Sequence, residues 1–116
     1  MDENWIAWAA GIFEGEGSIY QVGREQSNGK YNTQIVLQVK MTDQDVVHKF
    51  QEVLDRRGNI YFENRTKPRY KDQWTWRCAR RAQCVEIITL FWPYLGKRRK
   101  SKAIELGVDP LTIGGQ

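Results

Sequence analysis

Apolar and polar residues follow one another along the chain with two different periods. Apolar residues at helical spacing predict helices over residues 4–14, 46–54, 82–91 and 99–106. Alternation of apolar and polar residues predicts strands over residues 19–24, 31–41, 59–65 and 73–79. The resulting order, αββαββα(α), predicts an α+β domain in which helices back a four-stranded antiparallel sheet.

Cap and turn residues mark where these elements begin and end. Asn4 is expected to cap the first helix, and a capping box from Thr42 to Asp45 is expected to open the second helix, which Gly58 closes. Pro93 ends the third helix. Residues 27–30, Ser-Asn-Gly-Lys, predict a hairpin turn between the first two strands.

The predicted sheet has one apolar and one polar face. In the second strand Ile35, Leu37 and Val39 point to one side and amide and amine side chains to the other, with Val36 as an exception. Long amide and guanidinium side chains match the hydrogen-bonding pattern of base edges in a major groove, although such a face is often only solvated. A register slip of one residue would invert the prediction for a whole strand. The predicted DNA-facing set comprises Ser18, Tyr20, Val22, Arg24, Gln26, Asn32, Gln34, Gln38, Lys40, Tyr61, Glu63, Arg65, Gln73, Thr75 and Arg77.

Length, charge and cysteine content narrow the classes of protein. The 116 residues fit one domain, 1–116, in which residues 107–116 are expected to form a flexible tail. Lys and Arg number 18 against 14 acidic residues, and the net charge of +4 is compatible with a nucleic-acid partner. Cys78 and Cys84 lack metal-site spacing and are expected to be reduced thiols. With no signal peptide and no long apolar stretch, we expect an intracellular protein, cytoplasmic or organellar, without a membrane partner.

Two carboxylates lie at the end of the first predicted helix. The helix dipole disfavours negative charge at this end by up to about 1 kcal/mol per residue, and the segment around Glu14 and Glu16 contains no Lys or Arg. A cation from outside the segment would neutralise them. The alternative is an ordinary amphipathic helix that ends in a glycine cap and carries two solvated glutamates.

Small residues form a stripe along the same helix. Gly11 and Gly15 lie four residues apart on the face of Ala7, so a second helix could approach this face closely. Glycine inside a helix costs about 1 kcal/mol relative to alanine. A glycine cap explains one of these glycines but not Gly11, which favours a helix pair.

Residues 9–17, Ala-Ala-Gly-Ile-Phe-Glu-Gly-Glu-Gly, resemble the LAGLIDADG motif of homing endonucleases, and the predicted element order resembles that fold from about residue 4 to residue 103. The resemblance implies that two such helices pack together and that the last acidic residue, Glu16, is catalytic. It further implies that Glu16 and the carbonyl of Gly15 bind Mg²⁺ or Mn²⁺, and that Glu14 supports the helix end. The implied dimer interface consists of Ala7, Ala10, Gly11 and Gly15.

A basic segment follows the third predicted helix. In LAGLIDADG homing endonucleases, a lysine in this region often lies near the scissile phosphate. The resemblance implies that Arg99 takes this position when residues are counted back from Ala103. A small shift in the alignment with the family would place Lys97, Arg98 or Lys100 at the scissile phosphate instead. The alternative role for these residues and for Lys102 is contact with the phosphate backbone of DNA. Met41 stands where some relatives carry a polar residue near the attacking water.

One copy of the motif implies a homodimer, since two acidic helix ends make one active centre in this family. The expected function is therefore a metal-dependent double-strand cleavage of double-stranded DNA at a long near-palindromic site, associated with intron or intein mobility. A non-cleaving nucleic-acid binder on the same scaffold, such as an intron maturase or a regulator, is the alternative. A purely structural interaction module would leave the polar sheet face unexplained.

Overall fold

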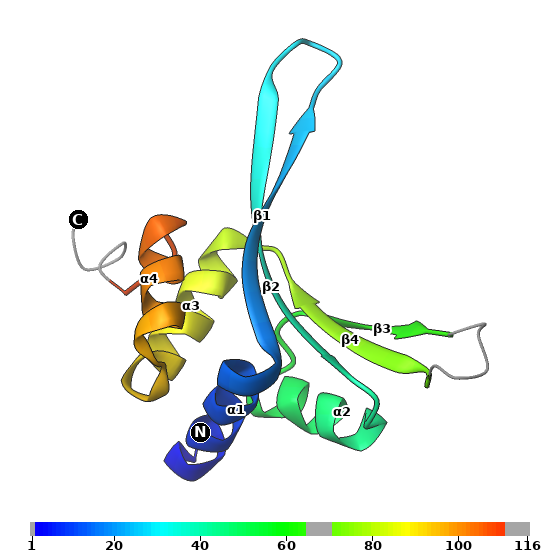
Figure 1. Ribbon diagram of the computed structural model, residues 1–116, viewed down its shortest axis with the longest axis vertical. Helices are drawn as coiled ribbons and strands as arrows, with labels where there is room; N and C mark the ends of the chain where they lie inside the picture. The colour runs from blue at the N-terminus through cyan, green and yellow to red at the C-terminus, as the bar shows by residue number, and fades with distance from the viewer. Residues whose placement is uncertain (1, 65–70, 111–116) are drawn as a thin grey trace.

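The computed structural model describes residues 2–64 and 71–110, apart from the side chains of Arg24 and Tyr31. The elements follow the order predicted from the sequence, with one additional 3₁₀ turn, η1 (Figure 1). Their bounds are α1 Glu3–Glu16, β1 Gly17–Glu25, β2 Tyr31–Met41, α2 Gln44–Val53, β3 Asn59–Glu63, β4 Gln73–Cys78, α3 Arg81–Phe91, η1 Trp92–Tyr94 and α4 Lys97–Glu105.

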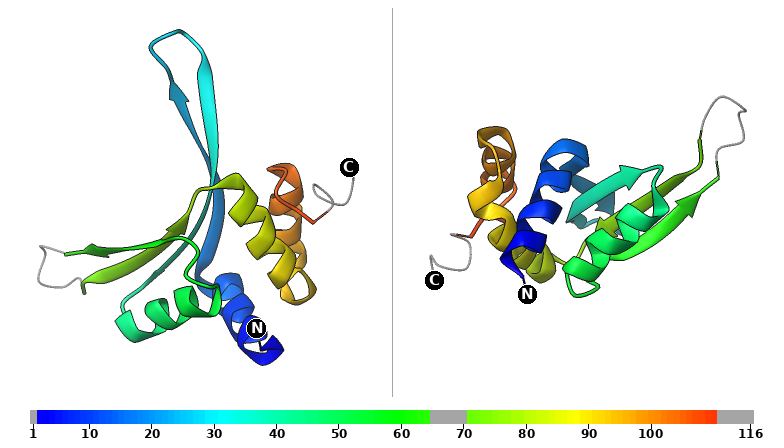
Figure 2. Two further views of the ribbon diagram at one scale, coloured as in Figure 1. Left: turned by 180° about the vertical axis from the view of Figure 1, so that it is seen from behind. Right: turned by 90° about the horizontal axis from the view of Figure 1, so that it is seen from below.

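The four strands form one antiparallel sheet in the order β1-β2-β4-β3. β4 pairs with β2 only from Leu37 to Met41, so the far half of the β1–β2 hairpin extends beyond the rest of the sheet. Figure 2 shows this hairpin and the β3–β4 arm diverging from a shared base, with α1 and α2 below the base and α3 and α4 beside it. The sheet is therefore open and curved on the side away from the helices.

The core lies between the sheet and the helices. Leu37 and Trp76 on the sheet and Phe13, Phe50 and Phe91 on α1, α2 and α3 are fully buried. Aromatic rings join these elements, because the ring centroids of Phe50 and Trp76 lie 4.8 Å apart and those of Phe13 and Phe91 lie 5.7 Å apart. Burial of such rings is the main stabilising contribution in a chain of this size.

Several element ends differ from the sequence-based predictions. Asp2, not Asn4, is the N-cap of α1, and its Oδ1 accepts a hydrogen bond from the Asn4 backbone N–H at 2.7 Å. Asp43 is the N-cap of α2 and makes no side-chain cap bond, so the Thr42–Asp45 capping box is not formed. α1 also continues two residues beyond the predicted end at residue 14, to Glu16.

The turn after α2 explains the glycine at position 58. Asp55 and Arg56 have φ of 53° and 60°, which reverses the chain direction after the helix. Gly58 has φ of +82°, and a Cβ there would lie 2.5 Å from Trp76 Nε1. That indole N–H donates to the Arg57 carbonyl at 2.8 Å. Gly58 thus allows the chain to pass against the central tryptophan of the core rather than capping α2 directly.

The chain after α4 is packed where a tail was expected to begin. Val108 is fully buried, and its backbone N–H donates to the Ala103 carbonyl at 2.9 Å. The predicted tail therefore does not start at residue 107, and residues 111–116 lie outside the described part. Cys78 and Cys84 are buried free thiols with their sulfurs 4.0 Å apart. Among the described helices, none combines the length and apolar character needed to cross a bilayer.

Candidate nucleic-acid interface and metal site

The end of α1 leads into β1 without a loop. Glu16 is the last residue of the helix and Gly17 is the first of the strand. The Gly17 N–H donates to the Phe13 carbonyl, and a Cβ at this position would lie 2.5 Å from that oxygen. Glycine is therefore required here by the close approach of the backbone. The tight junction leaves Gly15 and Glu16 exposed at the base of the sheet.

α1 and α4 cap each other. The Glu14 carboxylate accepts a hydrogen bond at 3.2 Å from the backbone N–H of Gly96, the N-cap of α4. Arg99 in the first turn of α4 donates through Nη2 to the Glu14 carbonyl at 3.1 Å. Each helix thus supplies the charge that the dipole of the other helix favours. The cation expected near the carboxylates is partly supplied by Arg99, from a segment far away in the sequence.

The Arg99 guanidinium is partly buried between α1 and α4. Its Nε is buried without a hydrogen-bond partner among the described residues, and its guanidinium lies 5.9 Å from the ring centre of Phe13. Burial lowers the pKa of Arg99, the Arg98 charge lowers it further, and Glu14 opposes both. Gly96 has no room for a side chain, because a Cβ would lie 2.8 Å from the Glu14 carboxylate. Arg99 therefore has a helix-capping contact, and its catalytic role stays a prediction.

The donors for a metal at the end of α1 are few. The described residues contain no group of three His, Cys, Asp or Glu side chains that could hold an ion. One chain offers the exposed Glu16 carboxylate and the Gly15 carbonyl. Mg²⁺ commonly takes one or two carboxylates and completes its shell with waters and phosphate oxygens. These donors fit such a shared site, but not a site built from one chain alone.

The outer face of α1 is open at both glycines. A Cβ built on Gly11 or on Gly15 meets nothing within 4 Å. No contact in the described part of the chain therefore requires glycine at either position. Ala7 is half-buried beside them, but Ala10 is fully buried in the core of its own chain. The predicted interface role of Ala10 is wrong, since its side chain lies on the inner face of the helix.

The strand register confirms that the predicted polar residues share one face. Ser18 pairs with Gln38 and Gln38 with Arg77, while Lys40 and Tyr61 both pair with Thr75. Directly paired residues point to the same side of a sheet. The other pairs on this face are Tyr20 with Val36, Val22 with Gln34, and Glu63 with Gln73. The backbone of Arg24 pairs with that of Asn32.

Some predicted residues of this face are placed differently. Thr75 is only 5% exposed and so presents little surface to a ligand. Gln26 lies beyond the end of β1, where its N–H donates to the Lys30 carbonyl at 2.8 Å and closes the hairpin turn. Arg65 lies outside the described residues. Met41 faces the opposite side and packs against the core, away from the polar face.

Three polar side chains on this face are linked, which the sequence did not indicate. Gln38 Oε1 accepts hydrogen bonds from Tyr20 Oη at 2.9 Å and from Arg77 Nη2 at 2.9 Å. The Arg77 guanidinium also lies 5.8 Å from the ring centre of Tyr61. Sequence alternation places these residues on one face, but their contact depends on the pairing of β2 with β4.

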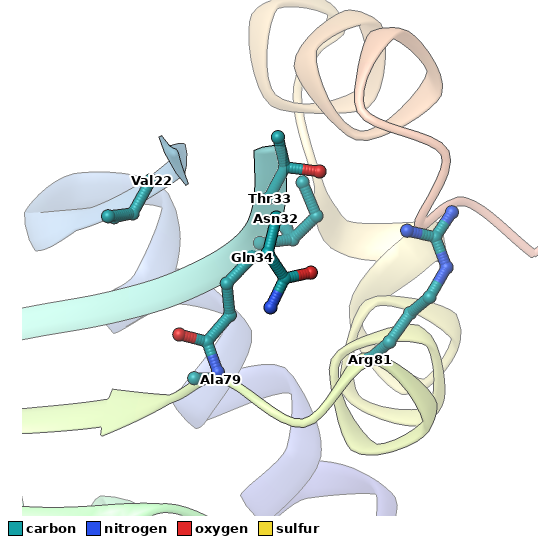
Figure 3. A pocket seen from close by; sticks show the side chains of 7 residues that line it. Val22, Asn32, Thr33, Gln34, Ala79 and Arg81 are labelled. Carbon is teal, nitrogen blue, oxygen red and sulfur yellow. The ribbon is translucent and has the colours of Figure 1, made fainter. Parts of the chain in front are cut away.

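A hollow of about 420 Å³ lies where the hairpin leaves the helices (Figure 3). The predicted DNA-facing residues Asn32 and Gln34 line it, and Figure 3 shows the Gln34 amide beside Ala79. Arg81, across the hollow, donates through Nη2 to the Gly107 carbonyl at 2.9 Å. This contact joins the start of α3 to the segment after α4, at one side of the hollow.

The basic residues after η1 lie on α4, which begins at Lys97 rather than at the predicted residue 99. Lys100 lies 5.3 Å from the ring centre of Trp92, and Lys102 pairs with Glu105 at 3.4 Å. A hollow of about 430 Å³ separates this helix from the start of β1 and is lined by Ser18, Ile19, Arg98, Arg99, Ser101, Lys102 and Glu105. The positive charge therefore lies beside the end of α1.

The fold defined by this sheet, its helices and the α1 motif is that of the LAGLIDADG homing endonucleases. No family model and no curated protein matches the sequence. The homing endonuclease I-CvuI in complex with its target is 19% identical, with a TM-score of 0.72 over 91% of this chain and 66% of that chain. The archaeal intron-encoded I-Vdi141I complexed with DNA is 18% identical, with a TM-score of 0.71 over 97% of this chain and 70% of that chain.

The group I intron-encoded I-CeuI complexed with DNA is 16% identical, with a TM-score of 0.71 over 96% of this chain and 55% of that chain. The chain thus spans 66% of I-CvuI and a smaller share of I-CeuI. A second I-CvuI structure was obtained in the presence of 2 mM Mg with its DNA not cleaved. These similarities confirm the predicted fold and the resemblance on which it was based.

Proposed function

We propose that two copies of this chain form a homodimeric endonuclease that makes metal-dependent double-strand breaks in a long, near-palindromic DNA site. The observation that carries the proposal is the position of Glu16, which is exposed at the end of α1 and directly precedes the polar face of the sheet. A carboxylate at this end of a helix is unfavourable unless a cation is present. A divalent cation held there would lie close to bound DNA, where it could stabilise the attacking and leaving oxygens of phosphodiester cleavage.

The open glycine face supports a dimer. No described residue lies close enough to Gly11 or Gly15 to exclude a side chain there. Glycine lowers the stability of the helix at these positions, and no contact within the described part of one chain explains why it is present. Close packing of two α1 helices would use this face and bring two Glu16 carboxylates together. A two-fold axis between the helices would favour a target whose two halves are related by the same symmetry.

The proposed metal is Mg²⁺ or Mn²⁺, with Glu16 and the Gly15 carbonyl of each copy as ligands. When bound, the ion would stabilise the attacking and leaving oxygens of the phosphodiester. Glu14 and Arg99 would hold the end of α1 against α4 and so fix the direction of the Glu16 side chain. Lys97, Arg98, Lys100 and Lys102 would contact phosphates, which adds affinity without sequence preference.

The polar face of the sheet would contact base edges in the major groove. Support comes from the amide, hydroxyl and guanidinium groups that share this face and from the open curvature between the two arms (Figure 2). The structures of the fold neighbours I-Vdi141I and I-CeuI are complexes with DNA. We further propose that the protein serves the mobility of an intron or intein.

A randomised duplex DNA library tests this proposal directly. The purified protein is incubated with the library with and without Mg²⁺, and bound and cleaved molecules are sequenced separately. We expect enrichment of one near-palindromic sequence, and cleavage of both strands only when Mg²⁺ is present. Enrichment without any cleavage would favour a maturase or regulator on the same scaffold. No enrichment in either fraction would contradict sequence-specific DNA binding.

A further inference from the structure

Three side chains from three strands form one hydrogen-bonded cluster at the centre of the polar face. Gln38 on β2 lies opposite Arg77 on β4, and Tyr20 on β1 reaches the same amide. The Gln38 Oε1 accepts from Tyr20 Oη at 2.9 Å and from Arg77 Nε and Nη2 at 3.2 and 2.9 Å. A single amide oxygen thus receives three hydrogen bonds, which fully occupies its two lone pairs.

These contacts fix the orientation of the Gln38 amide. Arg77 carries donors only, so the amide atom that faces it has to be the oxygen. The atom left for a ligand is Nε2, which can only donate. A glutamine that binds adenine in two places needs both its oxygen and its nitrogen, because adenine presents an acceptor and a donor in the major groove. Gln38 in this cluster cannot make that pair of contacts.

Arg77 keeps a second pair of donors. Its Nε and one Nη2 hydrogen face Gln38, and two N–H groups on the outer edge, one on Nη1 and one on Nη2, point away from that amide. The guanidinium is held between Gln38 and the ring of Tyr61, which lies 5.8 Å from its Cζ. Arg77 is exposed despite these contacts. A side chain already held in place loses less conformational entropy when it binds.

We infer that Arg77 recognises a guanine in each half of the target, with Gln38 as its positioning residue. The inference rests on the proposed function, because it assumes that this face lies against the major groove. Guanine presents two acceptors there, O6 and N7, which match the two outer N–H groups of Arg77. Adenine would place its N6 donor against an arginine donor. The cluster therefore discriminates against adenine as well as favouring guanine.

The library selection, repeated with variants, tests the assignment. Wild-type protein should prefer guanine to adenine at one symmetric pair of positions by roughly 5- to 150-fold. Arg77→Ala should remove that preference and leave the other positions unchanged. Arg77→Lys keeps the charge but loses the planar fork, so it should retain binding and relax the same position.

Two substitutions of Gln38 separate positioning from simple packing. Gln38→Glu keeps an acceptor for Arg77 and should retain the guanine preference. Gln38→Leu keeps the bulk but removes the acceptor, and it should weaken the preference at the Arg77 position. Tyr20→Phe is the matched control, because both Arg77 hydrogen bonds to Gln38 remain. It should leave the guanine preference at the Arg77 position in place, and any change at another position would report on Tyr20 itself.

The outcomes distinguish this inference from the proposed function. An enriched target in which Arg77→Ala and Arg77→Lys change no position overturns the inference and leaves the endonuclease proposal intact. A changed position occupied by a base other than guanine does the same. If wild-type protein enriches no sequence, the proposed function and the inference both fail.

Discussion

At the scale of single residues, Glu16 is the most consequential side chain. We predict that Glu16→Gln lowers Mg²⁺-dependent cleavage by about 1,000-fold, equivalent to about 4 kcal/mol, because the amide keeps the shape but loses the negative ligand. Dimerisation and specific binding should remain. Binding without metal should be equal or tighter, since one negative charge per chain is removed near the DNA phosphates.

The measurement compares cleavage rates and gel-shift affinities on the selected target. Glu52→Gln provides a matched control, because it removes one exposed carboxylate on α2, where it pairs with Lys49 away from the polar face and the basic residues of α4. Undiminished cleavage by a folded Glu16→Gln dimer would rule out the metal assignment.

A second prediction at this scale concerns the mutual capping of α1 and α4. Glu14→Ala removes the acceptor of the Gly96 N–H, and Arg99→Ala removes the donor to the Glu14 backbone carbonyl. Because the Glu14 charge also acts on the Arg99 guanidinium, their effects on the free energy of unfolding should not add. We expect a coupling energy of roughly 0.5–3 kcal/mol in a double-mutant cycle measured by urea denaturation. The pair Glu14→Ala with Lys30→Ala, in which Lys30 lies at the distant tip of the β1–β2 hairpin, should add to within about 0.5 kcal/mol. Additive behaviour of the first pair would show that the two helix ends are held by other contacts.

At the scale of elements, α1 carries both the core contacts and the proposed interface. Gly11→Leu should give a folded monomer, because a side chain at this position meets nothing within its own chain but would separate two packed helices. Sedimentation at micromolar concentration measures the association state, and circular dichroism checks the fold. Ile104→Ala on α4, where the native side chain is 54% exposed, is the control and should leave the association state unchanged. A Gly11→Leu dimer as tight as wild type would exclude this face as the interface.

Gly17, at the junction between α1 and β1, differs from Gly11 because its own chain leaves no room for a side chain. Gly17→Ala should destabilise the protein by about 1–3 kcal/mol, since the added Cβ would overlap the Phe13 carbonyl. The change in the urea midpoint measures this cost. Ser27→Ala, at an exposed position in the hairpin turn far from this junction, serves as the control. Equal stability of the two variants would show that the junction can relax.

The elements also show where sequence-based prediction succeeds. The alternation from Ile35 to Met41 correctly predicted a strand and its two faces, because side-chain direction in a strand is a local property. The order β1-β2-β4-β3 and the register of β2 with β4 depend on contacts between distant segments and were not predicted. For the same reason Arg99 was expected at a phosphate, while its contact with Glu14 joins residues 85 positions apart.

At the scale of the whole molecule, phosphate contacts and base contacts should make different contributions to the proposed DNA binding. Lys100→Ala should weaken binding to all sequences alike and reduce the slope of log affinity against log salt by about 1, because one phosphate contact is lost. Arg77→Ala should instead change the preference at one base pair. Titrations at several salt concentrations on specific and random duplexes distinguish the two effects. A sequence-dependent loss in Lys100→Ala would show that this residue contacts bases.

Dimerisation was predicted because the chain contains one copy of the motif, and it is a property of two chains together. The described residues supply the open face at Gly11 and Gly15 and an incomplete set of metal donors, and both would be completed by a second copy. The thermal midpoint should therefore rise with protein concentration. A midpoint independent of concentration over a hundredfold range would indicate a monomer.

The direct passage from α1 to β1 has a consequence for the products of cleavage. Glu16 and Ser18 are separated by Gly17 alone, which is fixed against the Phe13 carbonyl. In the proposed function, the offset between the bond that is cut and the first base pair contacted would therefore be set by the covalent chain and not by a movable loop. Variants selected for new targets through substitutions on the strands should leave single-stranded ends of the same length and polarity as the wild-type protein does, whichever sequence they cut.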